Sequence, residues 1–280
     1  MPNDISPPDL SPHKIAIRES SDRLALERDR WIRKNAYYYE DDHKFMRFLI
    51  PEGLRILDLG CGTGQLLAAL KPSQGIGVDI SEKMVAAARH KYPELSFRVG
   101  DAEDANFIGP LGGPFDVIVL SDLVGFMEDC ETTFDNLHRL CTRDTRLVIA
   151  YYSHLWEPVL RLAELFGNKM PQSQVNWLSV SDIAGLLYLA DFEVIKREWR
   201  QLIPKRLFGL GPLINRYIGT LPILRGACLR NYVVARPTPV RIEESLSTSV
   251  VIPCRNESGN IENAVQRIPR ICEVYAAVQK

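Results

Sequence analysis

The chain has 280 residues, 46% of them hydrophobic, which is enough for one large core with some chain beyond it. Its formal net charge of -1 argues against a nucleic-acid partner, because no overall positive field would recruit one. Six scattered cysteines form no C-x-x-C pair, so we predict reduced thiols, no metal site and no disulfide framework.

Long apolar stretches are absent from the sequence. No run of about 18 apolar residues occurs, so we predict no membrane-spanning helix. Residues 1–14 are rich in proline and polar side chains and lack the pattern of a signal peptide, and we expect a disordered lead there. These features predict a cytoplasmic protein that is at most peripheral on the inner membrane face.

Residues 15–50 interleave charged and apolar side chains, which predicts an N-terminal helical cap. Short β-rich runs follow, beginning at Leu54, Gly75, Leu95, Phe115 and Arg146. Runs with helical spacing lie between them, and Ser81 is a candidate N-cap for the second. Strands that are apolar on both faces and alternate with helices predict an α/β fold, with a parallel sheet covered on both sides.

After Tyr152, the spacing predicts helices near 156–166 and 181–189 and strands from Phe192 and Leu229. A polar, proline-containing stretch then predicts a linker. The chain therefore divides into a lead (1–14), a helical cap (15–50), a main domain (51–236), a linker (237–248) and a C-terminal strand-turn-helix fragment (249–280).

A glycine-rich turn, ILDLGCGTGQLL, carries the strongest local pattern. A strand ends near Asp58, and the chain turns through three glycines into a helix. Glycine allows a positive φ and lets a ligand approach the backbone, and the free N–H groups of a helix start can hold a carboxylate. An ordinary tight turn is the alternative. A dinucleotide fingerprint is a poorer match, because its third glycine position is Gln65.

Acidic side chains follow four strands of the expected sheet. Asp79 closes the second strand, Asp101 and Glu103 follow the third, and Asp122 follows the fourth. Each of these acids on its own is commonly a helix cap or a solvated loop residue. With Asp58 they gather at the carboxyl ends of the strands, where open α/β sheets bind ligands. Such a rim suits a ligand with a sulfonium and an ammonium better than a pyrophosphate.

These motifs resemble those of class I S-adenosylmethionine-dependent methyltransferases. ILDLGCGTG, GVDIS, GDAED and FDVIVLSDLVGFMED occur in the family's order and spacing, and the likeness extends from Leu54 to Arg236. The resemblance implies a Rossmann-like, seven-stranded, mostly parallel sheet with an antiparallel last strand. It implies that the glycines face the methionine moiety, Asp79 the ribose, and 101–103 the adenine. The predicted S-adenosylmethionine site comprises Asp58, Gly60, Cys61, Gly62, Thr63, Gly64, Asp79, Ile80, Met84, Asp101, Ala102, Glu103 and Ser121.

Methyl transfer from a sulfonium depends mainly on alignment of the acceptor with the methyl group. A general base is needed only where the acceptor must lose a proton, as a sugar hydroxyl must. Asp122 and His154 are the candidate catalytic residues, because each directly follows a strand. Glu157 is a further candidate, with Tyr151 and Tyr152 as wall residues. A solvated histidine is the alternative for His154.

Between Trp199 and Ile242 the chain carries eight basic residues and no acid, among many apolar ones. This pattern fits an insertion whose apolar face covers the sheet. It also fits a weak contact of residues 205–230 with an anionic membrane or a phosphate-linked acceptor.

The run VVIPCRNESGNIENAV resembles the start of family 2 glycosyltransferases, with Asn256 and Glu257 at the nucleotide-sugar position. The likeness covers only 249–269, and no acidic metal motif follows it. The sequence therefore predicts a methyltransferase that acts on a small-molecule or lipid-linked glycan acceptor. The alternatives are the front part of a bifunctional methyltransferase/glycosyltransferase and a non-catalytic cofactor-binding domain.

Overall fold

The computed structural model describes residues 10–171 and 176–238. The expected linker and fragment beyond Thr238 lie outside the described residues, as do residues 1–9 of the expected lead. The helical cap begins at Pro12 and not at residue 15, because Ser11 caps the helix by accepting a hydrogen bond from the Lys14 amide at 3.2 Å. The cap consists of α1 (Pro12–Leu24), α2 (Arg28–Lys34) and α3 (Ala36–Leu49).

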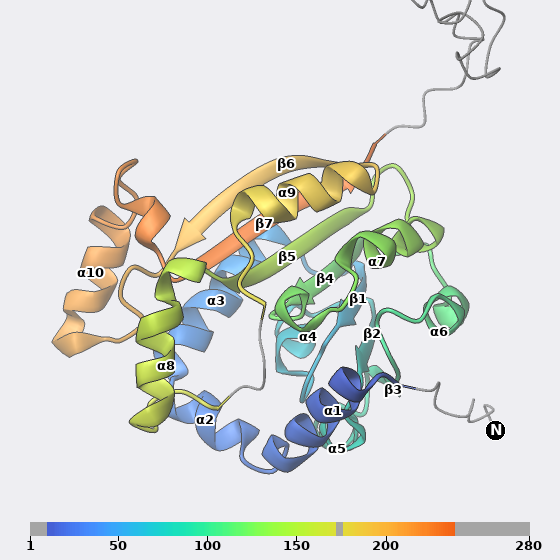
Figure 1. Cartoon of the computed structure of the whole chain (residues 1–280), viewed down its shortest axis with the longest axis horizontal. Coiled ribbons are helices and arrows are strands. Elements are labelled where there is room, and N and C mark those ends of the chain that lie inside the picture. The colour runs from blue at the N-terminus through green and yellow to red at the C-terminus, as the bar shows by residue number, and fades with distance from the viewer. Residues whose placement is uncertain (1–9, 172–175, 239–280) are drawn as a thin grey trace, which may run out of the picture. The chain divides into compact units, whose positions relative to one another are not determined.

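A seven-stranded sheet forms the centre of the molecule, in the order β3-β2-β1-β4-β5-β7-β6 (Figure 1). Its strands are β1 (Arg55–Leu59), β2 (Gln74–Asp79), β3 (Ser96–Val99), β4 (Val117–Ser121), β5 (Arg146–Tyr152), β6 (Phe192–Arg200) and β7 (Arg230–Pro237). β7 runs antiparallel to both β5 and β6, whereas β1 to β5 pair in parallel. This arrangement confirms the predicted Rossmann-like fold.

Helices connect the strands and cover both faces of the sheet (Figure 1). They are α4 (Gln65–Ala69), α5 (Glu82–Lys91), α6 (Ala105–Ile108), α7 (Cys130–Leu137), α8 (Glu157–Leu165), α9 (Val180–Leu189) and α10 (Leu210–Tyr217). Short 3-10 turns lie at Gly109–Leu111, Val124–Phe126, His138–Leu140, His154–Trp156, Leu207–Gly209 and Arg225–Ala227. Ser81 caps α5 as predicted, with its hydroxyl accepting from the Met84 amide at 3.1 Å.

Two apolar cores lie on opposite faces of the sheet because successive strand side chains point to opposite sides. In β1, Leu57 packs in the core that includes Phe134 of α7 and Ile183 of α9. Its neighbour Ile56 packs in the other core, with Met46 of α3 and Val85 of α5. All six side chains are fully buried. The sheet is therefore fixed between two layers, and its carboxyl edge carries the loops that follow β1 to β4.

A chain that ends at Thr238 is expected to keep the melting temperature of the full chain to within about 2 °C, because β7 completes the sheet at Pro237. Contacts also divide the chain between Thr238 and Pro239. Calorimetric unfolding of both chains is the measurement. A loss of more than about 5 °C, which corresponds to roughly 1–2 kcal/mol for a domain of this size, would make the tail part of the domain.

Candidate active site

The glycine-rich turn after β1 adopts the conformation that its glycines allow. Gly60, Gly62 and Gly64 have φ values of 76°, 53° and 78°. A Cβ on Gly64 would lie 2.7 Å from Cζ of Phe97, whereas a Cβ on Gly62 would meet no atom within 4 Å. Gly64 is therefore required for packing of the turn onto the sheet, and Gly62 borders open space where a ligand can approach.

Asp79 ends β2 and joins the two loops beside it. Its Oδ2 accepts a hydrogen bond from the Gly62 amide at 2.8 Å, and its Oδ1 accepts from the Ser81 amide at 2.9 Å. Burial raises the pKa of this carboxyl, although the two amide donors oppose that rise. Asp79 thus positions the glycine turn, and it also lines the cavity described next.

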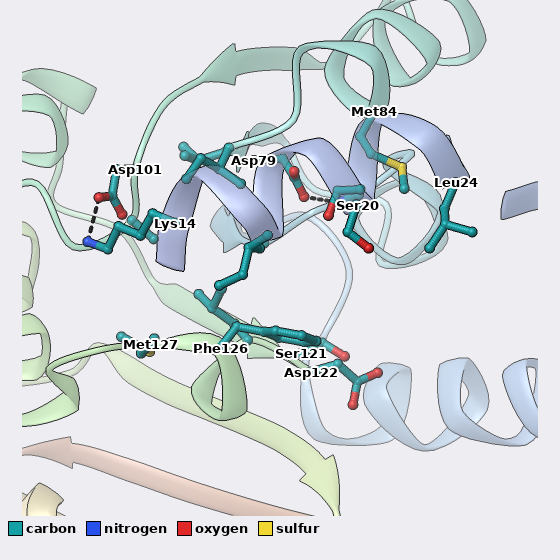
Figure 2. Close-up of a pocket in the computed structure, with 18 of the residues that line it drawn as sticks. Lys14, Ser20, Leu24, Asp79, Met84, Asp101, Ser121, Asp122, Phe126 and Met127 are labelled. Atoms are coloured by element: carbon teal, nitrogen blue, oxygen red, sulfur yellow. Dashed lines mark hydrogen bonds and ion pairs between the residues drawn. The ribbon is translucent and has the colours of Figure 1, made fainter. Parts of the chain in front are cut away.

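A cavity of about 1040 Å³ lies between α1 and the loops that follow β1 to β4. Figure 2 shows Lys14, Ser20 and Leu24 of α1 on one side, with Ser121 and Phe126 across from them. We call it the cofactor cavity. The predicted site residues that line it are Gly60, Gly62, Asp79, Ile80, Met84, Asp101, Ala102, Glu103, Ser121 and Asp122.

A smaller cavity of about 500 Å³ adjoins the cofactor cavity and shares Gly60, Ser121 and Asp122 with it. We call it the side cavity. It is lined by three further predicted residues, namely Asp58, Cys61 and Thr63. Gly64 lines neither cavity, because it faces Phe97 and Ala88. Burial raises the pKa of the Cys61 thiol, which fits a packing role.

Lys14 of α1 holds the acids that follow β3. Its Nζ lies 2.6 Å from Oδ2 of Asp101 (Figure 2). The same Nζ lies 2.9 Å from Oε2 of Glu103. Burial alone would lower the pKa of Lys14, but its bonds to these carboxylates raise it. The other oxygen of Glu103 accepts from the amides of Glu128 and Asp129 at 3.0 and 2.8 Å. Glu103 therefore ties the loops after β3 and β4 together, a role that the sequence does not indicate.

Asp58 is a buried acid that has no hydrogen-bond partner among the described residues. Its side chain lines the side cavity, it is 1% exposed, and neither carboxylate oxygen accepts a hydrogen bond from the described residues. Burial, with a smaller contribution from Asp79, raises its pKa to about 8. A buried, unpaired carboxylate favours a cationic ligand, because an ammonium would supply the missing hydrogen bonds and charge.

Arg28, which sequence reasoning missed, lies where three cavities meet. It lines the cofactor cavity, the side cavity and a third cavity described below. Burial alone would lower its pKa, but the surrounding acidic groups, including Asp122 and Asp79, raise it. Its Nη1 contacts Sδ of Met170 at 3.8 Å, and within 10–171 and 176–238 it forms no ion pair. No feature of the sequence around residue 28 distinguishes this arginine from its solvated neighbours.

Asp122 lines the same three cavities as Arg28. Its carboxylate forms an ion pair with Arg230. It has a positive φ of 59°, and its Oδ1 is in close contact with Nη1 of Arg230. Arg230, 1% exposed, also donates to Oδ1 of Asp42 at 3.0 Å and to Oγ of Ser121 at 2.9 Å. Tyr232 donates to the same Asp42 oxygen at 2.5 Å. The ion pair leaves Oδ2 of Asp122 as the oxygen available to a ligand.

A third cavity, of about 710 Å³, adjoins the cofactor cavity and shares Arg28, Asp122 and Met170 with it. We call it the acceptor-side cavity. Its wall includes four aromatic side chains, namely Trp31, Tyr38, Tyr39 and Tyr152. Burial raises the pKa of the Tyr152 phenol, so it remains protonated at neutral pH.

The other proposed catalytic residues lie away from these cavities. His154 is exposed on the 3-10 turn after β5 and lines none of the three. Glu157 pairs with Arg161 at 2.5 Å on the surface of α8. Tyr151 is buried beside a separate, smaller cavity next to Asp122. In the described part of the chain, no group of three or more metal-ligating side chains is placed to hold an ion, and no helix is long and apolar enough to cross a membrane.

Comparison with known proteins gives the class. A family model described as a methyltransferase domain matches residues 31–197. A solved SAM-dependent methyltransferase from Thermotoga maritima aligns with a TM-score of 0.61 at 21% identity, over 79% of this chain and 99% of that one. The fold is therefore that of the S-adenosylmethionine-dependent methyltransferases. The chain belongs to the methyltransferase domain family.

Two curated relatives are named methyltransferases. The arsenite methyltransferase of Aquipseudomonas alcaligenes is 30% identical over 160 residues, which are 52% of this chain and 43% of that protein. The dTDP-4-amino-2,3,4,6-tetradeoxy-D-glucose N,N-dimethyltransferase of Saccharopolyspora spinosa is 32% identical over 100 residues, 35% of this chain and 40% of that protein. The chain thus spans less than half the length of each.

Gly64→Ala is expected to destabilise the fold by roughly 2–4 kcal/mol, because it combines a positive φ with overpacking against Phe97. Gly53→Ala is the matched control, since Gly53 has a φ of 81° and open space around its Cβ position. The control should cost only about 1 kcal/mol. Urea unfolding measures both, and equal losses would contradict the packing argument.

Asp58 should make stability fall as pH rises. The folded protein holds its proton up to about pH 8, whereas the unfolded chain loses it near the ordinary value of 3.8. Between these values the folded state binds more protons, so the free energy of unfolding decreases with rising pH, in total by on the order of a few kcal/mol. Asp58→Asn should lack this component. Thermal unfolding of both proteins between about pH 5 and pH 8 tests it, and parallel curves would contradict it.

Proposed function

We propose that the chain holds S-adenosylmethionine across the cofactor and side cavities and transfers its methyl group to an acceptor in the acceptor-side cavity. One observation carries the proposal: among the described residues Asp58 accepts no hydrogen bond and Arg28 forms no ion pair, and both line the side cavity. An amino-acid group complements both side chains, because its carboxylate can pair with Arg28 and its ammonium favours the ionised form of Asp58. Asp79 would then accept from the ribose hydroxyls, with Ala102 and Met127 beside the adenine.

Asp101 is expected to accept a hydrogen bond from the adenine amino group. Lys14 competes for this carboxylate, because its Nζ already contacts Oδ2. Lys14 fixes the position of both acids while α1 covers the cavity. The remaining predicted cofactor residues act through backbone and shape. The glycine turn admits the ligand closely, and Ile80 and Met84 supply apolar surface.

Bound S-adenosylmethionine supplies an electrophilic methyl group whose leaving group is a neutral thioether. The protein's contribution is to align the acceptor and to receive a proton where the acceptor has one to lose. Asp122 is the proposed base, because it borders both the cofactor cavity and the acceptor-side cavity. Arg230 positions it through the ion pair with Oδ1. His154 has no comparable access, so we give it no role in the reaction.

The proposed acceptor is a small molecule or a lipid-linked glycan. Aromatic side chains such as Trp31, Tyr39 and Tyr152 give the acceptor-side cavity flat apolar walls, against which sugar rings can pack. The relative from Saccharopolyspora spinosa, named for a nucleotide-sugar substrate, supports this acceptor class. We also propose a cytoplasmic location and a weak contact of residues 205–230 with anionic membranes.

For the tail, residues 249–280, we propose separately that it is the start of a family 2 glycosyltransferase domain. This proposal rests on the motif with Asn256 and Glu257 alone, because residues 249–280 lie outside the described residues and the family match ends at residue 197. Binding of a UDP-sugar by the full chain would favour a bifunctional front fragment. Binding of S-adenosylmethionine without methyl transfer to any sugar or lipid fraction would favour a non-catalytic cofactor-binding domain.

Asp79→Ala should weaken S-adenosylmethionine binding by about 1.5–3 kcal/mol, the loss expected for charge-assisted hydrogen bonds to the ribose. Titration calorimetry of the folded variant is the measurement. Asp116→Ala is the matched control, because Asp116 also accepts a backbone amide, that of Arg55 at 2.8 Å, but at the amino end of β1. Unchanged affinity in the Asp79 variant, or an equal loss in the control, would remove the ribose role.

A further inference from the structure

The segment 205–227, which contains α10, carries a surface that is apolar where a solvated helix is normally polar. Phe208 and Ile223 are the most exposed, at 109% and 94%, and Leu210, Leu213 and Tyr217 are also exposed. We call these side chains, with the exposed cations of the same segment, the α10 face. α10 lies at one end of the molecule, away from the centre of the sheet (Figure 1).

Polar contacts on its inner side hold this helix in place. Asn215 accepts from the Ile203 amide at 2.8 Å and donates to the Tyr37 hydroxyl at 2.9 Å. Gly211 packs so closely on the backbone of Lys205 that a Cβ would lie 1.9 Å from its carbonyl oxygen. The helix is thus anchored through Asn215 and Gly211, while Leu210 and Leu213 point outward, whereas leucines of an amphipathic helix normally face the core. An outward apolar side of this kind marks an interaction surface.

Unpaired cations accompany the apolar side chains. Residues 199–238 contain no acid, and Lys205, Arg206, Arg216 and Arg225 are all exposed. Arg206 pairs with Glu40 at 2.7 Å. Arg216 and Arg225 instead lie over the rings of Tyr217 and Trp199, and neither has a carboxylate partner among the residues that the structure describes. The face therefore combines exposed apolar side chains with two arginines, Arg216 and Arg225, that have no carboxylate partner within the described residues.

We propose that the α10 face docks on an anionic lipid bilayer, with Phe208 and Ile223 inserted among the lipids and Arg216 and Arg225 at the level of the phosphates. Exposed aromatic and aliphatic side chains beside cations are the composition that binds such a surface. A second copy of the chain is a poor occupant, because a two-fold contact through this face would bring the arginines of both copies into one interface, and residues 199–238 contribute no acid to offset them.

The docked surface borders the acceptor-side cavity. Lys205, the first residue of the segment, and Pro204 just before it line that cavity. Leu160 and Ala163 of α8 line it as well. Trp156, just before α8, donates to the Ala227 carbonyl at 2.8 Å and so joins α8 to the end of the segment. Bilayer contact would bring an acceptor with a lipid tail to this side of the cavity, a consequence that rests on the proposed function, whereas the docking itself does not.

Vesicle co-sedimentation of the full chain tests the docking. We expect binding to phosphatidylcholine vesicles that contain about 30% phosphatidylserine, weak binding without it, and loss of binding as salt rises from about 0.1 M to about 0.5 M. The double variants Arg216→Gln/Arg225→Gln and Phe208→Ala/Ile223→Ala should each reduce binding at least about tenfold.

Matched controls lie elsewhere on the surface. Arg139→Gln/Arg143→Gln removes two exposed cations that precede β5, and Leu26→Ala removes a leucine that is 91% exposed between α1 and α2. Both should bind vesicles as the parent chain does. Equal binding to neutral and anionic vesicles, no binding to either, or an equal loss in the controls would overturn the proposal. So would a dimer in light scattering that Phe208→Ala/Ile223→Ala dissociates.

Calorimetry with S-adenosylmethionine separates this proposal from the proposed function. None of the substituted residues lines the cofactor or side cavity, so all variants should retain the parent affinity. Vesicle binding without any affinity for S-adenosylmethionine would leave the docking in place and remove the proposed function.

Discussion

The buried guanidinium of Arg230 is the constraint on which the site depends. A charge that is 1% exposed must be paired, and Arg230 finds its partners in Asp42 of α3 and Asp122 after β4. The ion pairs therefore join the antiparallel strand β7, the helical cap and the loop at the carboxyl edge of the sheet. Removing Arg230 would leave two neighbouring carboxylates without their cation, which is the costly case. The cation also lies over the rings of Tyr38 and Tyr152, two walls of the acceptor-side cavity.

From this fixed point the proposed chemistry divides between the cofactor cavity and the acceptor-side cavity. Asp122, held by Arg230, is common to both, so the position where an acceptor would meet a cofactor is set by the fold and not by a mobile loop. On the cofactor side, α1 closes the cavity through Lys14, and the acids that it pairs come from the loop after β3. On the acceptor side, α2, α3 and α8 supply the wall. The helical cap thus contributes to both binding sites.

The sequence predicts the part of the site that follows from strand ends. Asp58 and Asp79 lie at the carboxyl ends of β1 and β2, and Asp101 follows β3. Parallel strands bring their carboxyl ends to one edge, so local pattern is sufficient to place these acids at that edge. Arg28 and Lys14 reach the same cavities from helices whose packing is determined by tertiary contacts, and nothing in their neighbourhood indicates it. Arg230 is part of a run that predicts a strand, but its partner Asp42 is 188 residues away.

His154 shows the limit of the strand-end rule. It follows β5 closely, as Asp122 follows β4, yet Ser153 and the 3-10 turn His154–Trp156 direct the chain onto the surface. The ring therefore lies outside the cavities that Asp122 lines. The first helix begins at Pro12 and not at the predicted residue 15, because Ser11 caps it through a local hydrogen bond that composition alone does not show.

A crystal structure of the full chain with S-adenosylhomocysteine tests the central claim most directly. The account predicts the amino group of the ligand within hydrogen-bond distance of Asp58, its carboxylate at Arg28, its ribose hydroxyls at Asp79 and its sulfur facing Asp122. A ligand bound elsewhere, or one bound in the cofactor cavity with Asp58 and Arg28 still unpaired, would contradict it.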